Sequence, residues 1–199
     1  GVQVVGADEV TRIACGVSSS LELFRRTRAL GAELLLVHHG LFWDGDSRVV
    51  DATLRARLEE LFAGNVNLVA YHLCLDAHPQ IGNNALLADA LGVGSERKAF
   101  AEFGIGGALA APASTAELVE RVAETVGRVP LVFDAGPDPV ARVAICSGSA
   151  AGAIDAAAEA GYDCLITGEA REPTMMAARE LGITFIAAGH YATETFGVK

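Results

Sequence analysis

The stretch Gly189-His190-Tyr191-Ala192-Thr193-Glu194 directly follows the apolar run 183–188. The run predicts a buried strand, and the glycine ends it. His190 and Glu194 are four residues apart, and residues with this spacing share one face of a helical turn. An imidazole beside a carboxylate at the end of a strand is a candidate pair of metal ligands. Taken alone, so short a motif more often marks a histidine that caps the strand beside a solvated glutamate.

The composition limits the class of protein. The chain has 199 residues, 51% of them hydrophobic, enough for one large domain or two small lobes with a core. The net charge is −10 and no lysine or arginine run forms a basic stripe, so we do not expect a nucleic-acid partner. No apolar run reaches the length of a membrane span, and no signal peptide is visible. We therefore expect no membrane partner either.

The four cysteines show no C-x-x-C spacing and mostly lie in apolar, strand-like runs. This favours reduced core cysteines and a cytoplasmic location. The chain starts at Gly1 without a methionine, and we expect both ends of the natural protein to lie outside this sequence. The cysteines are Cys15, Cys74, Cys146 and Cys164.

Short apolar runs alternate with helical patterns along the chain, which predicts an α/β fold with mostly parallel sheet. Residues 95–113 are less regular. Their glycines at 104, 106 and 107 lack the preceding strand and following helix of a dinucleotide-binding loop. Strands are predicted at residues 2–5, 11–17, 34–37, 67–70, 131–134, 142–146, 164–167 and 183–188.

The two halves of the chain resemble each other. Arg12-Ile13-Ala14 matches Arg142-Val143-Ala144, and Gly31 matches Gly161, both at an offset of 130 (142 − 12 and 161 − 31). A later match pairs His72 with His190 at an offset of 118 (190 − 72). Chance similarity between βα units is the alternative, but the shared His-x-x-x-acid pattern favours a duplication. Two related lobes would bring equivalent strand ends towards a shared cleft.

Polar residues follow several of the predicted strands, where ligands gather in open α/β sheets. His38-His39 could instead be a loop pair that binds backbone groups, and Asp76 could cap a turn. Three imidazoles and two carboxylates exceed the needs of one zinc ion and suit two metals about 3.5–4 Å apart, as in many hydrolases. His72 and Glu169 are expected behind the ligands, orienting them. The candidate ligands are His38, His39, Asp76, His190 and Glu194.

These motifs resemble the Nif-three-like family of dinuclear metal-centre proteins, some of which are labelled GTP cyclohydrolase I type 2 homologues. The resemblance covers nearly the whole chain. It rests on Leu36-Val37-His38-His39-Gly40, His72-Leu73-Cys74-Leu75-Asp76, Cys146-Ser147-Gly148-Ser149, Leu165-Ile166-Thr167-Gly168-Glu169 and the segment from Ala188 to Glu194.

The resemblance implies two intertwined α/β lobes with a metal site in the cleft between them. It also implies a ring-shaped homohexamer. We expect an N-terminal lobe at residues 1–97, carrying His38, His39 and Asp76, and a C-terminal lobe at residues 98–199, carrying His190 and Glu194, with no inserted domain. The same five residues would hold two divalent ions per chain, and nitrogen and oxygen ligands suit Zn, Mn, Fe, Co or Ni alike.

The expected activity is metal-dependent hydrolysis of a small nucleotide- or pterin-like substrate, with Glu169 as a proton relay. A two-metal phosphoesterase and a non-catalytic metal-binding scaffold or regulator are the alternatives. The turn at Gly148 could hold a phosphate or be an ordinary tight turn. Two departures from the family pattern, Ala170 to Pro173 in place of a histidine and Asn84 in place of an acid, affect the expected substrate contacts.

Overall fold

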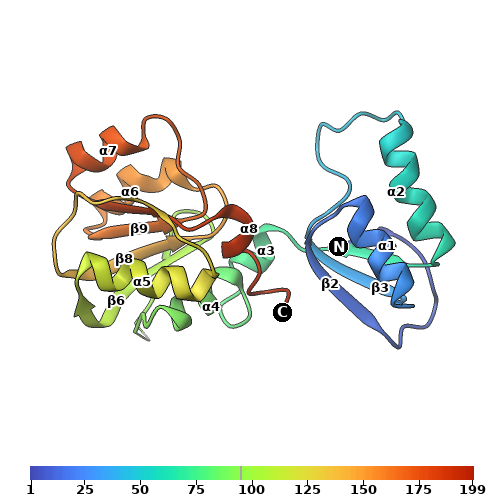
Figure 1. The fold of residues 1–199 in the computed structure, drawn as a ribbon, viewed down its shortest axis with the longest axis horizontal. Coiled ribbons are helices and arrows are strands. Elements are labelled where there is room, and N and C mark those ends of the chain that lie inside the picture. Colours follow the sequence, from blue (N-terminus) through green and yellow to red (C-terminus); the bar gives the residue numbers. More distant parts are fainter. Residues whose placement is uncertain (95) are drawn as a thin grey trace. The chain divides into compact units, whose positions relative to one another are not determined.

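The computed structural model describes residues 1–94 and 96–199, which form two compact units. The first unit comprises Gly1–His72 with Val198–Lys199, and the second comprises Leu73–Gly197. In Figure 1 the first unit runs from blue to cyan, and the second from green to red. Each unit contains its own β-sheet and its own hydrophobic core.

This division comes earlier in the chain than the boundary at residues 97 and 98 expected from the sequence. Helix α4, Asn83–Ala90, packs against strands β6 (Gly104–Ala113) and β8 (Val140–Cys146) of the second unit. Helix α3, Leu73–Asp76, packs in turn against α4. Asp76 therefore lies in the second unit and not in the N-terminal lobe expected from the sequence.

The first unit is a four-stranded sheet in the order β1-β4-β3-β2, with two helices packed on it. Its three parallel strands bury Leu35 and Leu68 against Phe24 and Leu61 of the helices, each at most 1% exposed. Strand β1 pairs antiparallel with β4. The elements are β1 (Val2–Val4), β2 (Ile13–Ser18), α1 (Leu21–Ala29), β3 (Leu34–His39), α2 (Ala52–Ala63) and β4 (Asn67–Ala70).

The second unit is a six-stranded sheet in the order β5-β6-β8-β9-β10-β7. Strands β8, β9 and β10 are parallel, and the outer strands pair antiparallel. The α/β prediction is confirmed, with antiparallel strands at the sheet edges. The remaining elements are β5 (Lys98–Phe100), α5 (Thr115–Val126), β7 (Leu131–Phe133), η1 (Ala151–Ala153), α6 (Ile154–Glu159), β9 (Cys164–Thr167), α7 (Thr174–Leu181), β10 (Thr184–Ala187) and α8 (His190–Thr193).

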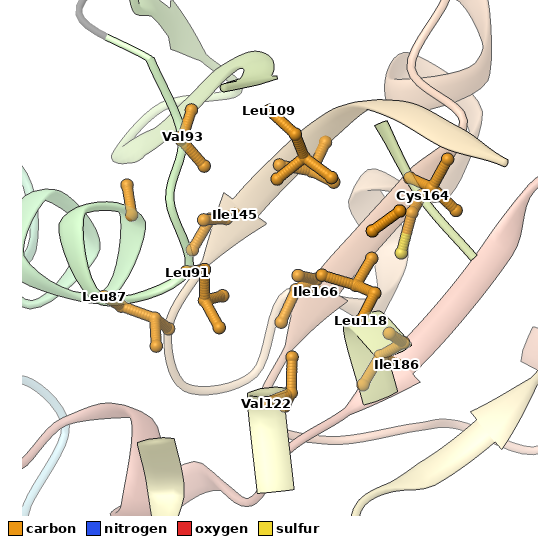
Figure 2. Packing of buried hydrophobic residues seen from close by; sticks show 14 of the residues in the cluster. Leu87, Leu91, Val93, Leu109, Leu118, Val122, Ile145, Cys164, Ile166 and Ile186 are labelled. Atoms are coloured by element: carbon orange, nitrogen blue, oxygen red, sulfur yellow. The ribbon is translucent and has the colours of Figure 1, made fainter. Parts of the chain in front are cut away.

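Helices cover both faces of this second sheet. Neighbouring residues of a strand point to opposite faces, so Ile166 packs in the cluster with α4 and α5, while Leu165 packs in the cluster with α6 and α7. Figure 2 shows the first of these clusters, in which Leu118 and Val122 of α5 face the strands. Burial on both faces explains why these strands are almost continuously apolar in sequence.

Side-chain caps begin helices α1, α2 and α5. Ser20, Asp51 and Ser114 accept backbone hydrogen bonds at the starts of α1, α2 and α5, and Ser114 forms a capping box with Glu117. Gly127 ends α5 in the left-handed conformation, where glycine meets no steric penalty. Among the described residues, no helix has both the length and the apolar character needed to cross a membrane.

The stretch 95–113 is more regular than expected, apart from Ser95, which lies outside the described residues. It contains strand β5 and the ten-residue strand β6. Glycine is required within β6 because a Cβ atom at Gly106 would lie 2.3 Å from the ring of Tyr162. Gly106 thus lets the strand pack against an aromatic side chain, and the glycines belong to a strand and not to a dinucleotide-binding loop.

Strand pairing supports the duplication. Ile13 pairs with Leu34, and Val143 pairs with Cys164. Each residue of the second pair lies 130 positions after its counterpart in the first (143 − 13 and 164 − 34). The carboxylate of Glu33 accepts hydrogen bonds from the backbone nitrogens of residues 11 and 12, and Asp163, 130 residues on, does so from residues 141 and 142. The orders β1-β4-β3-β2 and β7-β10-β9-β8 are likewise equivalent.

The third strand of the repeat needs a correction of one residue. Leu34 pairs with Asn67, and the equivalent Cys164 pairs with Thr184, an offset of 117 (184 − 67) instead of 118. The ladder therefore aligns His72 with Gly189, and His190 comes one residue later. The sequence match had paired two histidines that do not occupy equivalent strand positions.

Two of the four cysteines lie in the core and two do not. Cys146 and Cys164 are buried, and burial raises the pKa of the Cys146 thiol to about 11, with a further contribution from the charge of Asp76. Cys15 and Cys74 are exposed, so the expectation that they belong to the core was wrong. All four cysteines are free thiols.

Candidate metal centre

Three glycines bring the ends of β8, β9 and β10 into close contact in the second unit. Gly168 donates a backbone hydrogen bond of 2.8 Å to Gly148, and Gly189 donates one of 2.9 Å to Gly168. A Cβ atom at Gly168 would lie 2.4 Å from the carbonyl oxygen of Gly148. Only glycine permits so close an approach of the two backbones. The turns after the three strands are therefore packed directly against one another.

His190 and Glu194 lie together at this edge of the sheet, as the spacing of four predicted. His190 begins α8, and its Nε2 lies 3.1 Å from Oε1 of Glu194. The buried Thr193 fixes the helical turn, because its hydroxyl accepts a bond from the nitrogen of Gly148 and donates one to the carbonyl of Gly189, each of 3.0 Å. Because the nitrogen of Gly148 is used in this way, the turn is a tight structural turn and not a phosphate site.

Gly148 also makes room for the carboxylate of Glu194. Its φ angle is +69°, and a Cβ atom there would lie 2.4 Å from Oε1 of Glu194 and 3.3 Å from Nε2 of His190. Gly148 therefore serves the site by having no side chain, which leaves space for the carboxylate of Glu194. The sequence motif pointed to this glycine without indicating that role.

Asp76 is oriented by Ser147, Asn83 and Asn84, which were not expected in the site. Its Oδ1 accepts hydrogen bonds from the hydroxyl of Ser147, at 2.7 Å, and from the amide of Asn83, at 2.9 Å. Asn84 accepts a 2.7 Å bond from the nitrogen of Ser147 and donates bonds to the carbonyls of Asp76 and Phe103. Asn84 thus ties the backbone at Asp76 to the backbone at Ser147 and Phe103. The pair Gly82-Asn83 before it was the available sequence signal.

Three histidines of the first unit form a cluster. His38 and His39 are the last two residues of β3, so they are not on a turn beyond the strand as expected. Their ring centroids are nevertheless 4.6 Å apart, and His72 lies 5.0 Å from His38 and 5.2 Å from His39. One ligand nitrogen from each ring lies within 4.8 Å of the others. The cluster could hold a metal ion, and His72 is one of its candidate ligands.

The Nδ1 atoms of the three predicted histidine ligands all have partners. Nδ1 of His38 lies 3.0 Å from the carbonyl of Tyr71, that of His39 lies 2.9 Å from the hydroxyl of Ser18, and that of His190 lies 2.8 Å from Glu169. A carbonyl or a carboxylate can only accept, so Nδ1 donates in His38 and His190, and the lone pair of the neutral ring lies on Nε2. Histidines that bind metals usually have such an outer partner.

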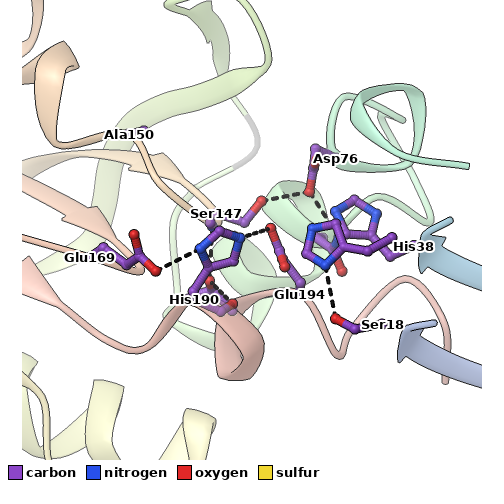
Figure 3. Close-up of polar contacts among 12 residues, drawn as sticks. Ser18, His38, Asp76, Ser147, Ala150, Glu169, His190 and Glu194 are labelled. Atoms are coloured by element: carbon purple, nitrogen blue, oxygen red, sulfur yellow. Dashed lines mark hydrogen bonds and ion pairs between the residues drawn. The ribbon is translucent and has the colours of Figure 1, made fainter. Parts of the chain in front are cut away.

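Figure 3 shows the chain of contacts within the second unit, from Glu169 through His190 to Glu194. Because Nε2 of a neutral His190 and Oε1 of Glu194 would both be acceptors, their separation of 3.1 Å calls for a proton or a metal cation between them. A divalent cation bound by both groups would serve this purpose. Imidazole and carboxylate donors suit a first-row divalent metal.

The family follows from comparison with known proteins. The model of the Duf34/NIF3 family (NGG1p interacting factor 3) matches residues 1–199. The chain belongs to this family. The resemblance seen in the motifs is thereby confirmed, and the Duf34/NIF3 relatives below cover the chain from end to end.

Two relatives are named GTP cyclohydrolase 1 type 2 homolog. That of Pseudomonas aeruginosa is 43% identical over 207 residues, covering 100% of this chain and 80% of the relative. That of Escherichia coli K12 is 44% identical over 202 residues, covering 100% and 81%. The solved structure of protein ybgI, described as of unknown function, superposes with a TM-score of 0.94 at 44% identity, covering 100% of this chain and 80% of that chain.

Proposed function

We propose that the chain binds two divalent metal ions and uses them to hydrolyse a small nucleotide- or pterin-like substrate. The observation that carries the proposal is the common tethering of Nδ1 in His38, His39 and His190, which aims Nε2 of each ring for a ligand. In this proposal the ligands of the ions are His38, His39, Asp76, His190 and Glu194.

The protein's own residues would orient the ligands and move protons. Glu169 keeps the proton of His190 on Nδ1, while Ser147 and Asn83 fix one oxygen of Asp76. Bound ions would supply an activated water and polarise the bond to be cleaved. The side chain of Glu169 is 49% exposed, so it can exchange a proton with solvent and serve as the relay.

Family membership supports the further parts of the proposal. The relatives' name, GTP cyclohydrolase 1 type 2 homolog, favours a nucleotide-like substrate. A ring-shaped homohexamer in the cytoplasm completes the proposal, and the free thiols agree with a reducing compartment. Light scattering on the purified chain measures the size of the assembly.

Elemental analysis of purified protein tests the metal centre. We expect two ions per chain in the wild type and a loss of at least one in His190→Ala and in Asp76→Ala. His78→Ala is the matched control, because Nδ1 of His78 accepts bonds from the backbone of residues 80 and 81 within its own loop. A wild-type protein that takes up no metal after reconstitution would overturn the proposal.

Turnover separates an enzyme from a scaffold. We expect metal-dependent hydrolysis in a panel containing GTP, a pterin and a phosphodiester, and its loss in Glu194→Ala. An assembly that keeps two ions per chain but hydrolyses none of these compounds would favour the scaffold. Cleavage of the phosphodiester alone would favour the phosphoesterase.

A further inference from the structure

The loop after His39 is held in one conformation by Gln3 of strand β1. The amide oxygen of Gln3 accepts hydrogen bonds from the nitrogens of Leu41, at 2.6 Å, and Phe42, at 3.3 Å, and its amide nitrogen donates to the carbonyl of Phe42 at 2.9 Å. A Cβ atom at Gly40 would lie 2.4 Å from that amide oxygen. The glycine therefore permits the close approach, and the loop is fixed before any ligand binds.

This fixed loop presents an indole ring beside the histidine cluster. Nε1 of Trp43 donates to the carbonyl of Gly40 at 3.1 Å, and the backbone nitrogen of Trp43 donates to Asp46 at 2.7 Å. The indole ring meets His72 edge-on, with centroids 4.8 Å apart, and lies 5.9 Å from His39. Despite these contacts, Trp43 is 44% exposed and Phe42 is 42% exposed.

A pocket of about 200 Å³ lies at this place in the first unit, lined among others by His38, Phe42, Trp43, Asp44 and His72. Its volume is below the range of about 300–1,000 Å³ that suits drug-sized ligands, so it fits a single ring system better than a whole nucleotide. Aromatic walls bind planar rings by stacking, at a small cost in side-chain entropy because the walls are already fixed.

The polar group at the pocket wall selects the kind of ring. The amide of Gln3 is already engaged by the loop backbone, whereas Asp44 lines the pocket as a carboxylate, which only accepts hydrogen bonds. A carboxylate pairs well with two adjacent N–H groups, because both of its oxygens can accept in parallel. Rings with a ring N–H next to an exocyclic amine offer such an edge.

We infer that the pocket at Trp43 is the substrate-recognition site for a planar heteroaromatic ring that stacks on the indole and presents adjacent N–H donors to Asp44. This inference rests on the proposed function, since it places the ring of the substrate beside candidate metal ligands. Trp43 and Asp44 are binding residues in this account and take no part in the chemical step.

Calorimetric titration of the full chain tests the inference, with guanosine as the probe, inosine as the same ring without the exocyclic amine, and ribose as the sugar alone. We expect guanosine to bind more tightly than inosine, and ribose not to bind. Trp43→Ala should weaken guanosine binding about 5- to 150-fold, the range for the loss of one stacked aromatic, and Trp43→Phe should restore most of it. Phe62→Ala, which removes an exposed aromatic of the same unit away from the pocket, should bind as wild type.

The outcomes distinguish this inference from the proposed function. Undetectable guanosine binding, or equal affinity in Trp43→Ala and wild type, would overturn the stacking site, whatever the metal content. Equal affinity for guanosine and inosine would overturn the role of Asp44. A chain that binds guanosine through Trp43 but holds no metal would retain the ring site and refute the hydrolase. Trp43 is the only tryptophan of the chain, so quenching of its fluorescence reports ring binding directly.

Discussion

Replacing Gly148 by alanine should weaken metal binding and leave the fold in place. The glycine has a φ angle of +69°, and the added methyl group would lie 2.4 Å from Oε1 of Glu194. Ordinary contact begins at 3.4 Å, so the carboxylate must move by about 1 Å (3.4 − 2.4). Metal–ligand distances tolerate only about 0.2 Å. Glu194 could then no longer hold its position as a ligand.

Two effects of the substitution have to be separated. An alanine in the left-handed region costs about 1–2 kcal/mol wherever it occurs. Gly127→Ala is the matched control, because Gly127 has a φ angle of +70° in the same unit and no atom within 4 Å of the added Cβ. Both variants should lose about 1–2 kcal/mol of unfolding free energy, but only Gly148→Ala should lose metal affinity, by about 10- to 100-fold, the usual effect of disturbing the surroundings of a ligand.

The assay is competition for zinc with a chromophoric chelator, combined with denaturant unfolding of each metal-free variant. The unfolding free energies identify the part of the effect that comes from backbone strain. Equal zinc affinity in Gly148→Ala and Gly127→Ala would refute the reasoning, because Glu194 would then not bind the ion from the position it occupies beside Gly148.

Three further predictions concern the outer contacts, the thiols and the core. Glu169→Ala should weaken metal binding about 10- to 100-fold in chelator competition, because the imidazole of His190 loses its outer partner. The unfolding free energy should change little, because Glu169 is exposed. At about pH 8, Cys15 and Cys74 should react with a thiol reagent in the native protein, whereas Cys146, with its pKa raised to about 11, should react only after unfolding, as counted by mass spectrometry. Phe185→Ala should lower the unfolding free energy by about 3–5 kcal/mol, because the fully buried ring leaves a cavity; a loss below 1 kcal/mol would contradict this.

Features that depend on short stretches of chain could be predicted from sequence. The strand at residues 164–167 was placed correctly, because an apolar run bounded by glycine has few other interpretations. The pairing of His190 with Glu194 was correct because a helical turn fixes residues four apart on one face. The duplication was visible in the sequence because its first two strands keep a constant offset of 130 residues.

Features that depend on distant contacts could not be predicted. The hydrogen bond between Ser147 and Asp76 joins residues 71 positions apart, and no local pattern announces it. Strand β6 was missed because its glycines have little strand propensity and are explained only by distant neighbours, such as the ring of Tyr162 beside Gly106. Helix α3 has only four residues, too few for a helical period to appear. The extent of the two units follows from where α4 packs, which is again a tertiary property.

The strand order of the two repeats has a consequence for how the chain avoids unwanted association. In the first unit β2 is the outermost strand, and among the described residues no strand pairs with its outer flank. In the second unit the equivalent strand, β8, is covered by β6, and β6 by β5. Exposed strand flanks recruit other strands and promote aggregation. The segment that joins the two repeats therefore also covers the edge of the second sheet. Inserted sequence is best tolerated after residue 113, where it leaves the pairing of β6 with β8 intact.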